Sequence, residues 1–382
     1  MHADAPADLA VIGGGGVGAF AMRAAARTGA RVIGFERRWP AHPGGSSHGE
    51  SRVWRHAYFE HPDYVPLLRH SSADFAALEV EAGAPLLVRC GVLVAGPPGS
   101  TIVEGCRAAA RAHGLPVEEL DAAGLRARAP ALALGPDGSG IFEADAGFVR
   151  PEAAVDAALR VAVRAGATLY TGDAVLGLDE DAGGVTVHTG RGSLRARAAL
   201  VCAGAWTAGL LPSLAGLLHV TRQVQGWFCP ADAGADVDRL PCWLVDRGPG
   251  ERLVYGIPCD PLRPGPRRAK IAVHGSDIPL DPDRDPRAVG PADRVALEAM
   301  RDRYAPGVGW PLAEARVCAY TMTPDEHFIV DRVPGARRIV TVAGLSGHGF
   351  KLTPALGAAA AALALTGQTE LPIGFLGLSR FA

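Results

Sequence analysis

Residues 8–36 contain the pattern that most narrows the folds open to this chain. An apolar run at 9–12 is followed by the residues GGGGVG at 13–18, and an alanine-rich stretch then leads to a second apolar run that ends in Glu36. Strand, glycine turn, helix, strand and acidic residue, in this order, are typical of a dinucleotide-binding Rossmann unit. A glycine-rich hairpin is the competing interpretation, and the complete order favours the dinucleotide site.

Each part of this pattern has a physical role in holding a dinucleotide. Glycines let the backbone approach a pyrophosphate, and the positive end of the following helix attracts it. The Glu36 carboxylate can accept hydrogen bonds from ribose hydroxyls. The pattern alone does not distinguish NAD from FAD.

The rest of the chain alternates between helical and strand-like segments, which predicts an α/β fold. We expect strands at 168–178 and 194–202, with a loop rich in Pro, Gly and Asp at 230–250. The last strand is expected at 338–342, followed by a helix whose N-cap is Thr353. A chain of 382 residues is long enough for one large unit or two closely joined domains.

Composition argues against several classes of protein. The net charge is −2, so the surface is not polycationic and nucleic acid is not expected as a partner. The longest apolar stretch, at 355–365, is too short for a membrane span, and the first residues lack the basic segment of an export signal. Seven scattered cysteines form no C-x-x-C pair, which predicts no metal site and a reduced, cytoplasmic location.

Lysine is almost absent, which makes its two positions informative. The sequence contains 36 arginines, no asparagine and only two lysines, Lys270 and Lys351. Arginine is a planar fork of fixed charge, whereas lysine is a compact point charge whose pKa can be shifted. The two lysines are either chance survivors of a coding bias or positions whose chemistry needs an ammonium group.

Four further segments are rich in residues that can carry chemistry. They are SSHGESRVWRHAY at 46–58, YGIP at 255–258 with KIAVH at 270–274, CAYTMTPDEHF at 318–328, and GLSGHGFK at 344–351. Together with the glycine motif, and over almost the whole chain, they resemble the monomeric sarcosine oxidase and N-methyltryptophan oxidase family of D-amino-acid-oxidase-like flavoproteins. This resemblance implies FAD rather than NAD.

The resemblance also implies an architecture. A discontinuous Rossmann-like FAD-binding domain is expected from residues 1–85, 150–218 and 325–382. A second domain with a mixed sheet, which covers the flavin and binds substrate, is expected from 86–149 and 219–324. The chain is expected to be a monomer or a weak dimer.

By resemblance, Cys318 is the cysteine that forms a thioether to the flavin. A thiolate can attack an electrophilic form of the cofactor, and the attachment raises the flavin potential. A small buried core residue is the alternative for a lone cysteine.

Charged residues of the same segments receive roles by resemblance as well. Arg55 and Lys351 hold the substrate carboxylate, one as a fork and the other as a point charge. Arg52 and His48 lie against the flavin ring, and Lys270 stands near flavin N5, where its charge assists the reaction with oxygen. Both lysines therefore fall on site positions, which favours a chemical role for them.

The expected site residues form three groups. Catalytic roles are assigned to Lys270, Arg52, His274 and His348, and substrate contacts to Arg55, Tyr255, Tyr320 and Lys351. The expected cofactor contacts are Gly13, Gly15, Gly18, Glu36, Arg37, Ser47, His48, Arg52, Val175, Gly204, Cys318, Gly347, Gly349 and Lys351. Leu244 and the stretch 258–268 match nothing in the family pattern, so the substrate is specified less well than the cofactor.

These residues predict an FAD-dependent oxidase that acts on a C–N bond of an amino-acid-like substrate. The substrate carries a carboxylate and an N-methyl or cyclic secondary amine, oxygen is the acceptor, and the products are an imine and hydrogen peroxide. One alternative is a tailoring oxidase of secondary metabolism that acts on a tryptophan-derived, indole or cyclic imino-acid intermediate. The other is a non-catalytic flavin-binding protein.

Overall fold

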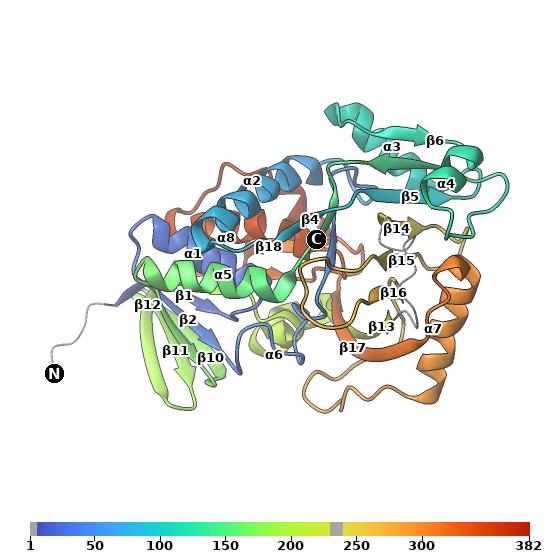
Figure 1. Ribbon diagram of the computed structural model, residues 1–382. Coiled ribbons are helices and arrows are strands. Elements are labelled where there is room, and N and C mark those ends of the chain that lie inside the picture. The colour runs from blue at the N-terminus through green and yellow to red at the C-terminus, as the bar shows by residue number, and fades with distance from the viewer. Residues whose placement is uncertain (1–5, 230–239) are drawn as a thin grey trace.

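The computed structural model describes residues 6–229 and 240–382, and its first large sheet contains the dinucleotide motif (Figure 1). The strands β1 (Ala7–Ile12), β2 (Val32–Glu36) and β12 (Gly192–Val201) form its parallel centre, with β1 in the middle. β9 (Thr168–Thr171) extends the sheet beyond β2, and β19 (Ile339–Ala343) extends it beyond β12. Antiparallel pairing adds β10 (Val175–Asp181), β11 (Gly184–Thr189) and β18 (Ile329–Arg332).

Four helices pack together beside one face of this sheet (Figure 1). They are α1 (Gly16–Arg27), α2 (Tyr64–Ala82), α5 (Pro151–Arg164) and α8 (Thr353–Thr366). Small residues bring α1 and α8 close, since a Cβ at Gly357 would lie 2.7 Å from the backbone nitrogen of Ala21. The buried Arg23 of α1 is paired with Asp74 at 2.8 Å and Glu81 at 3.0 Å, both on α2, so its charge is compensated.

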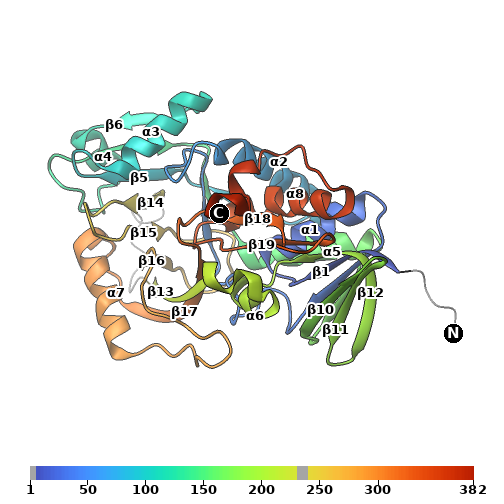
Figure 2. The same ribbon diagram turned by 180° about the vertical axis from the view of Figure 1, so that it is seen from behind.

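The opposite face of the first sheet carries shorter elements. The helix α6 (Thr207–Leu210) contacts β10, and Leu211 and Leu214 are buried against the sheet just after it. Seen from behind, α6 lies between the first sheet and the strands β13 and β17 of the second (Figure 2). The strand β12 therefore leads into a segment placed between the two large sheets.

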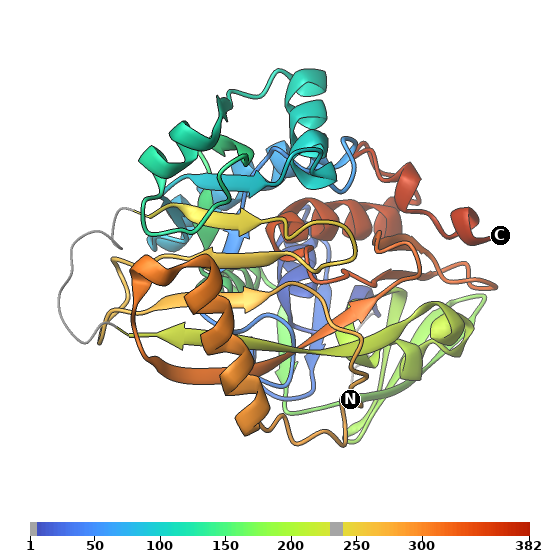
Figure 3. The same ribbon diagram turned by 90° about the vertical axis from the view of Figure 1, so that its right-hand side faces the viewer.

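The second large sheet is mostly antiparallel. Its strands, in spatial order, are β17 (Leu312–Met322), β13 (His219–Phe228), β16 (Ala269–Val273), β15 (Val254–Ile257), β14 (Cys242–Val245), β5 (Val92–Gly96), β7 (Ser139–Glu143) and β6 (Glu118–Leu120). The helix α7 (Pro291–Tyr304) lies across one face of it (Figure 3). Two further helices, α3 (Thr101–His113) and α4 (Ala122–Arg128), pack beside β5, β6 and β7.

A small third sheet connects the two large ones. Its strands are β3 (Arg52–Trp54), β8 (Gly147–Val149) and β4 (Leu87–Arg89), with β8 in the centre. The expected α/β fold with a Rossmann-like unit and a mixed sheet is confirmed. We propose that the domain limits expected from sequence follow the two large sheets, with β3 as the FAD-domain strand that crosses to the second domain.

Three local predictions from sequence are wrong. The single strand expected at 168–178 is two strands at opposite edges of the sheet, because the chain turns at Gly172, whose φ is +67°. The loop expected at 230–250 contains β14, whose four apolar residues are all buried; residues 230–239 lie outside the described part. The N-cap of α8 is Leu352, and Thr353, which was expected there, is the first helical residue. The Thr353 hydroxyl donates to the carbonyl of Phe350 at 2.8 Å.

None of the helices in the described ranges is long and apolar enough to cross a membrane.

The contact between α1 and α8 can be tested by one methyl group. Gly357→Ala should lower the free energy of unfolding by about 1–3 kcal/mol, because the added Cβ presses on the backbone of α1. This loss opposes the gain of about 1 kcal/mol that alanine normally brings to a helix. Gly216→Ala is the matched control, since a Cβ there meets nothing within 4 Å. Denaturant unfolding that shows equal stability for both variants would contradict the tight crossing.

Candidate functional site

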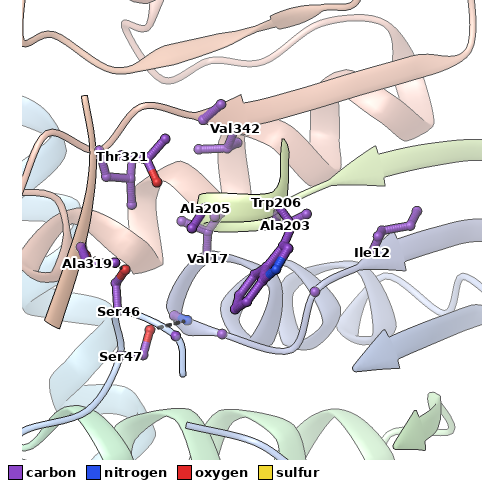
Figure 4. A pocket seen from close by; sticks show the side chains of 18 of the residues that line it. Ile12, Val17, Ser46, Ser47, Ala203, Ala205, Trp206, Ala319, Thr321 and Val342 are labelled. Atoms are coloured by element: carbon purple, nitrogen blue, oxygen red, sulfur yellow. Dashed lines mark hydrogen bonds between the residues drawn. The ribbon is translucent and has the colours of Figure 1, made fainter. Parts of the chain in front are cut away.

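A cavity in the described part of the chain opens at the carboxyl ends of the parallel strands, where dinucleotides bind in such sheets. Its volume is about 390 Å³. The wall includes the glycine turn after β1 and the carboxyl ends of β2, β12, β19 and β17 (Figure 4). The cavity is thus built from both large sheets.

Glycine is required in the turn after β1 by close backbone contacts. Gly13 has a φ of +103°, and a Cβ there would lie 2.4 Å from the carbonyl oxygen of Cys202. A Cβ at Gly18 would lie 1.8 Å from the carbonyl oxygen of Gly13, so this glycine serves turn and helix packing and does not line the cavity. Gly15 is the N-cap of α1 and does line the cavity, so the helix begins at the wall.

Glu36 lies at the end of β2 and is almost completely buried. Its carboxylate accepts hydrogen bonds from the backbone N–H of Gly14 at 2.9 Å and of Arg38 at 3.0 Å. Burial would raise the pKa of Glu36, but these bonds and His42, 3.3 Å away, hold its pKa below the usual value. The Nδ1 atom of His42 is buried without a partner, and His42 also lines the cavity.

The loop between β16 and α7 contributes Asp283 to this part of the cavity wall. Asp283 forms an ion pair with Arg37 at 3.0 Å and accepts a hydrogen bond from the Trp206 indole at 2.9 Å. The Arg37 guanidinium lies 4.4 Å from the centre of the Trp206 ring. The Trp206 side chain extends into the cavity in Figure 4.

The segment 46–58 joins the glycine turn to the second sheet. The Ser47 hydroxyl accepts from the backbone N–H of Gly16 at 3.0 Å, and the Ser46 hydroxyl donates to the carbonyl of Ala319 at 2.7 Å. Buried or part-buried carboxylates hold its backbone: Glu152 accepts from Gly49 at 2.6 Å and Glu143 accepts from His56 at 3.0 Å. The segment is therefore fixed at several points along its length.

Lys270 holds the same segment from β16. It is only 2% exposed, and its ammonium group donates to the carbonyl oxygens of Gly49, at 3.1 Å, and Ser51. Burial and the neighbouring Arg52 lower its pKa well below the usual value. Lys270 does not line either of the two cavities described here.

His48 and Cys318 lie behind the cavity wall, beside Arg52, which is part of that wall. Both ring nitrogens of His48 are buried without a partner, and burial together with Arg52 lowers the pKa of His48 to about 3. Arg52 donates to the carbonyl of Ser46 at 2.8 Å and lies 3.9 Å from the sulfur of Cys318. Cys318 is fully buried in β17, and its neighbour Ala319 lines the cavity.

A smaller cavity of about 60 Å³ adjoins the larger one. The two share four lining residues, Arg52, Tyr320, Gly347 and Phe350. The remaining wall of the smaller cavity combines charged groups with apolar side chains; its residues are Ser51, Val53, Arg55, Phe59, Glu60, Leu244, Leu253, Tyr255, Ile257, His274, His348 and Lys351.

The cations of the smaller cavity are already paired within the protein. Arg55 is 2% exposed and forms an ion pair with Glu60 at 3.0 Å. The Lys351 ammonium donates to the carbonyl of His348 at 2.9 Å, and its Nζ lies 4.9 Å from the centre of the Tyr58 ring. Burial and Arg55 lower the pKa of Lys351 to about 7.

The two histidines of the smaller cavity are neutral at pH 7. Burial lowers the pKa of His274 to about 4 and that of His348 to about 3. Both ring nitrogens of His348 are engaged, Nδ1 with the Tyr58 hydroxyl at 2.5 Å and Nε2 with the carbonyl of Glu326 at 2.9 Å. The His274 ring contacts the Tyr320 hydroxyl at 3.3 Å.

The structure brings most of the expected site residues to these two cavities. Those at the larger cavity are Gly13, Gly15, Glu36, Arg37, Ser47, Arg52, Val175, Gly204, Tyr320, Gly347 and Gly349. Those at the smaller cavity are Arg52, Arg55, Tyr255, His274, Tyr320, Gly347, His348 and Lys351. Gly18, His48, Lys270 and Cys318 line neither and lie behind the walls.

The wall residues that sequence reasoning missed include His42, Glu60, Trp206 and Asp283, whose side chains make polar or ring contacts. Two of them had a usable signal: Trp206 follows the strand ending at 202, and Glu60 lies two residues beyond Tyr58. Asp283 lies in a Pro/Asp-rich loop far from any motif, and only the folded chain brings it to the wall.

Comparison with known proteins gives relatives that match nearly the full length. Monomeric sarcosine oxidase of Streptomyces avermitilis is 37% identical over 379 residues, which is 98% of each chain. N-methyl-L-tryptophan oxidase of Salmonella dublin is 35% identical over 377 residues, 98% of this chain and 99% of that one.

Solved structures give the same fold. NikD, described as an unusual amino acid oxidase essential for nikkomycin biosynthesis, matches with a TM-score of 0.83 at 24% identity over 97% of each chain. Glycine oxidase from Geobacillus kaustophilus matches with a TM-score of 0.79 at 21% identity, covering 98% of this chain and 99% of that one. At these identities the two structures support the fold alone.

The family model described as FAD dependent oxidoreductase matches residues 8–363, which include both large sheets and both cavities. The expectation of FAD rather than NAD is thereby confirmed. With the dinucleotide cavity in place at the strand ends and relatives of more than 30% identity along its whole length, this chain belongs to the family of FAD-dependent oxidoreductases.

Proposed function

We propose that this protein is an FAD-dependent amine oxidase that oxidises the C–N bond of a small amino-acid-like secondary amine with oxygen, giving an imine and hydrogen peroxide. One observation carries the proposal. A small cavity lined by Arg55 and Lys351 opens onto the dinucleotide cavity, and Arg52 belongs to both walls. A carboxylate-bearing substrate would thus lie between fixed positive charges and the cofactor.

The residues of the larger cavity fit FAD. The backbone at Gly15 is exposed to the cavity, and Glu36 lies where ribose hydroxyls are bound in such folds. The Nδ1 atom of His42, which lines this cavity, is also buried without a partner, and a polar cofactor would supply one. We therefore assign FAD to this cavity.

Arg55 and Lys351 are proposed to bind the substrate carboxylate. Arg55 offers two parallel N–H donors and Lys351 a single point charge, so together they fix both position and orientation. Glu60 holds Arg55 when no substrate is bound. A substrate carboxylate must take the place of Glu60 at Arg55, which makes binding selective for an anion that reaches both cations.

We propose that the substrate reacts with its amine in the neutral form, and the histidines of the cavity add no proton donor beside it. His274 and His348 have pKa values of about 4 and 3, so neither carries a proton that it could give to the amine at pH 7. The Tyr255 and Tyr320 hydroxyls are hydrogen bonded to each other, and burial raises the pKa of Tyr255 to about 12. A neutral amine keeps the nitrogen lone pair that assists loss of hydride from the neighbouring carbon.

FAD held in the larger cavity would supply the acceptor for this hydride, and water would hydrolyse the imine. The contribution of the chain is positioning: Arg55 and Lys351 fix one end of the substrate, and the apolar wall from Leu244, Leu253 and Ile257 excludes water. We propose that Arg52 stabilises negative charge on the cofactor. We also propose that Lys270 stabilises the negative charge that develops during the reaction with oxygen.

The size of the smaller cavity favours a small substrate over an indole-bearing one. Its volume of about 60 Å³ is a fraction of the roughly 300–1,000 Å³ typical of sites for drug-sized ligands. We therefore place the tailoring oxidase for a tryptophan-derived intermediate second.

The function is tested by following the two halves of the reaction separately. Sarcosine, pipecolate and N-methyltryptophan are each mixed with the enzyme without oxygen, and flavin absorbance is recorded. Sarcosine or pipecolate should bleach the flavin faster than N-methyltryptophan does. Bleaching by N-methyltryptophan alone would favour the tailoring oxidase, and no bleaching by any amine would favour a non-catalytic flavoprotein.

A substitution at Lys270 distinguishes the reaction with substrate from the reaction with oxygen in the same experiment. Lys270→Met should slow the reaction of the bleached enzyme with oxygen by at least an order of magnitude, because it removes a buried positive group, while bleaching by substrate changes far less. Equal slowing of both halves would remove Lys270 from the oxygen reaction.

Covalent attachment through Cys318 has its own test. We propose that acid-precipitated protein stays yellow, and that Cys318→Ser releases the colour into the supernatant. Cys202→Ser is the matched control, since Cys202 lines the larger cavity directly and its substitution should leave the colour with the protein. Loss of colour from the unmodified protein in acid would refute the thioether.

The carboxylate clamp predicts a pH dependence for ligands that have no amine. Lys351 is protonated below its pKa of about 7, so propionate should bind about tenfold more weakly at pH 8 than at pH 6. Lys351→Met should bind propionate weakly at both values. Flavin absorbance reports the binding, and an unchanged pH dependence in Lys351→Met would show that another group titrates.

A further inference from the structure

Two cysteines lie side by side in the apolar cluster that also contains Leu244 and Ile257. The sulfur atoms of Cys90 and Cys242 are 3.7 Å apart. Cys90 stands between β4 and β5, and Cys242 is the first residue of β14, which pairs in parallel with β5. The backbone N–H of Cys242 donates to the carbonyl of Gly91 at 3.0 Å, so the two chain segments are already joined.

The distance and the backbone arrangement suit a disulfide. A disulfide requires sulfur atoms about 2 Å apart and Cα atoms on closely neighbouring chain segments. Because the backbones are hydrogen bonded beside the two residues, rotation of the side chains is enough to bring the sulfur atoms together. No other sulfur-to-sulfur contact is found among the described cysteines.

The two thiols differ in a way that suits stepwise oxidation. Cys90 is half-buried, whereas Cys242 is fully buried. The hydrogen bond from Cys242 lowers the pKa of Cys90, while burial raises the pKa of Cys242. Cys90 is thus the more accessible and more readily ionised of the pair, which are the two properties of an oxidation-sensitive cysteine.

We propose that Cys90 and Cys242 are a dithiol that hydrogen peroxide oxidises to a disulfide. The Cys90 thiolate attacks one oxygen of peroxide, the O–O bond breaks, and hydroxide leaves and takes up a proton. The sulfur of Cys242 then attacks the resulting sulfenic acid, the S–S bond forms, and water leaves. In total, two thiols and one hydrogen peroxide give one disulfide and two waters.

The bond would tie the start of β14 to the corner between β4 and β5. Leu244, two residues after Cys242, lines the smaller cavity, so the tie lies on the strand that supplies part of the wall around the proposed substrate. Hydrogen peroxide is also the product of the proposed reaction, which would expose this pair to its oxidant during turnover. Adding peroxide directly makes the test independent of the proposed activity.

The holoenzyme is treated with a small excess of hydrogen peroxide, the remaining thiols are alkylated, and tryptic peptides are analysed by mass spectrometry without reduction. We expect one cross-linked species that joins the peptide 90–107 to the peptide 240–247, and its loss after treatment with dithiothreitol. Peptide 90–107 also contains Cys106, so Cys106→Ser is used to assign the bond, which should persist in that variant.

Cys90→Ser should abolish the cross-link, and Cys229→Ser, at another half-buried cysteine, should leave it unchanged. Oxidation of Cys90 to sulfinic acid with Cys242 still alkylated would overturn the proposal, as would a link from Cys242 to Cys106. The test does not require a substitution at the fully buried Cys242. The cross-linked peptides of the unmodified chain and of Cys90→Ser show whether the disulfide forms.

Discussion

Buried cations constrain how the loops of this protein fold, and one of them, Lys270 of β16, joins its two halves, because it donates to the carbonyl oxygens of Gly49 and Ser51. Arg55, Lys270 and Lys351 are each at most 7% exposed, and an unpaired charge at such a depth costs several kcal/mol. Backbone carbonyls satisfy the two lysines, and Glu60 with a further carbonyl satisfies Arg55. The loops that supply these acceptors come from the first half of the chain and from its C-terminal segment, so the cations are stable only when the loops are folded around them.

The segment 46–58 is held by one of these cations and places charged side chains at both cavities. It receives hydrogen bonds from the glycine turn, is held by carboxylates from β7 and α5, and accepts from Lys270 on β16. A segment fixed at so many points can hold Arg52 in the wall shared by both cavities. The positive charges near the cofactor are therefore fixed in place before any ligand arrives.

The sequence predicted those parts of the site that depend on local pattern. The glycine turn, Glu36 and the strand that leads to it follow from neighbouring residues, and the motif segments led to Arg52, Arg55 and Lys351. It could not show that Asp283 forms an ion pair with Arg37, because the fold joins residues far apart in sequence. The ion pair between Arg55 and Glu60 lies within one loop, but no regular helix or strand pattern there predicts which charges meet. It also misjudged 168–178, where the turn at Gly172 divides one apolar-looking run between opposite edges of a sheet.

The central claim is that Arg55 and Lys351 receive the substrate carboxylate beside bound FAD. A crystal structure of the holoenzyme with bound propionate tests it most directly. The account predicts a carboxylate in contact with both cations, an Arg55 side chain released from Glu60, and the flavin ring next to Arg52. A carboxylate bound outside the smaller cavity, with the ion pair between Arg55 and Glu60 intact, would contradict it.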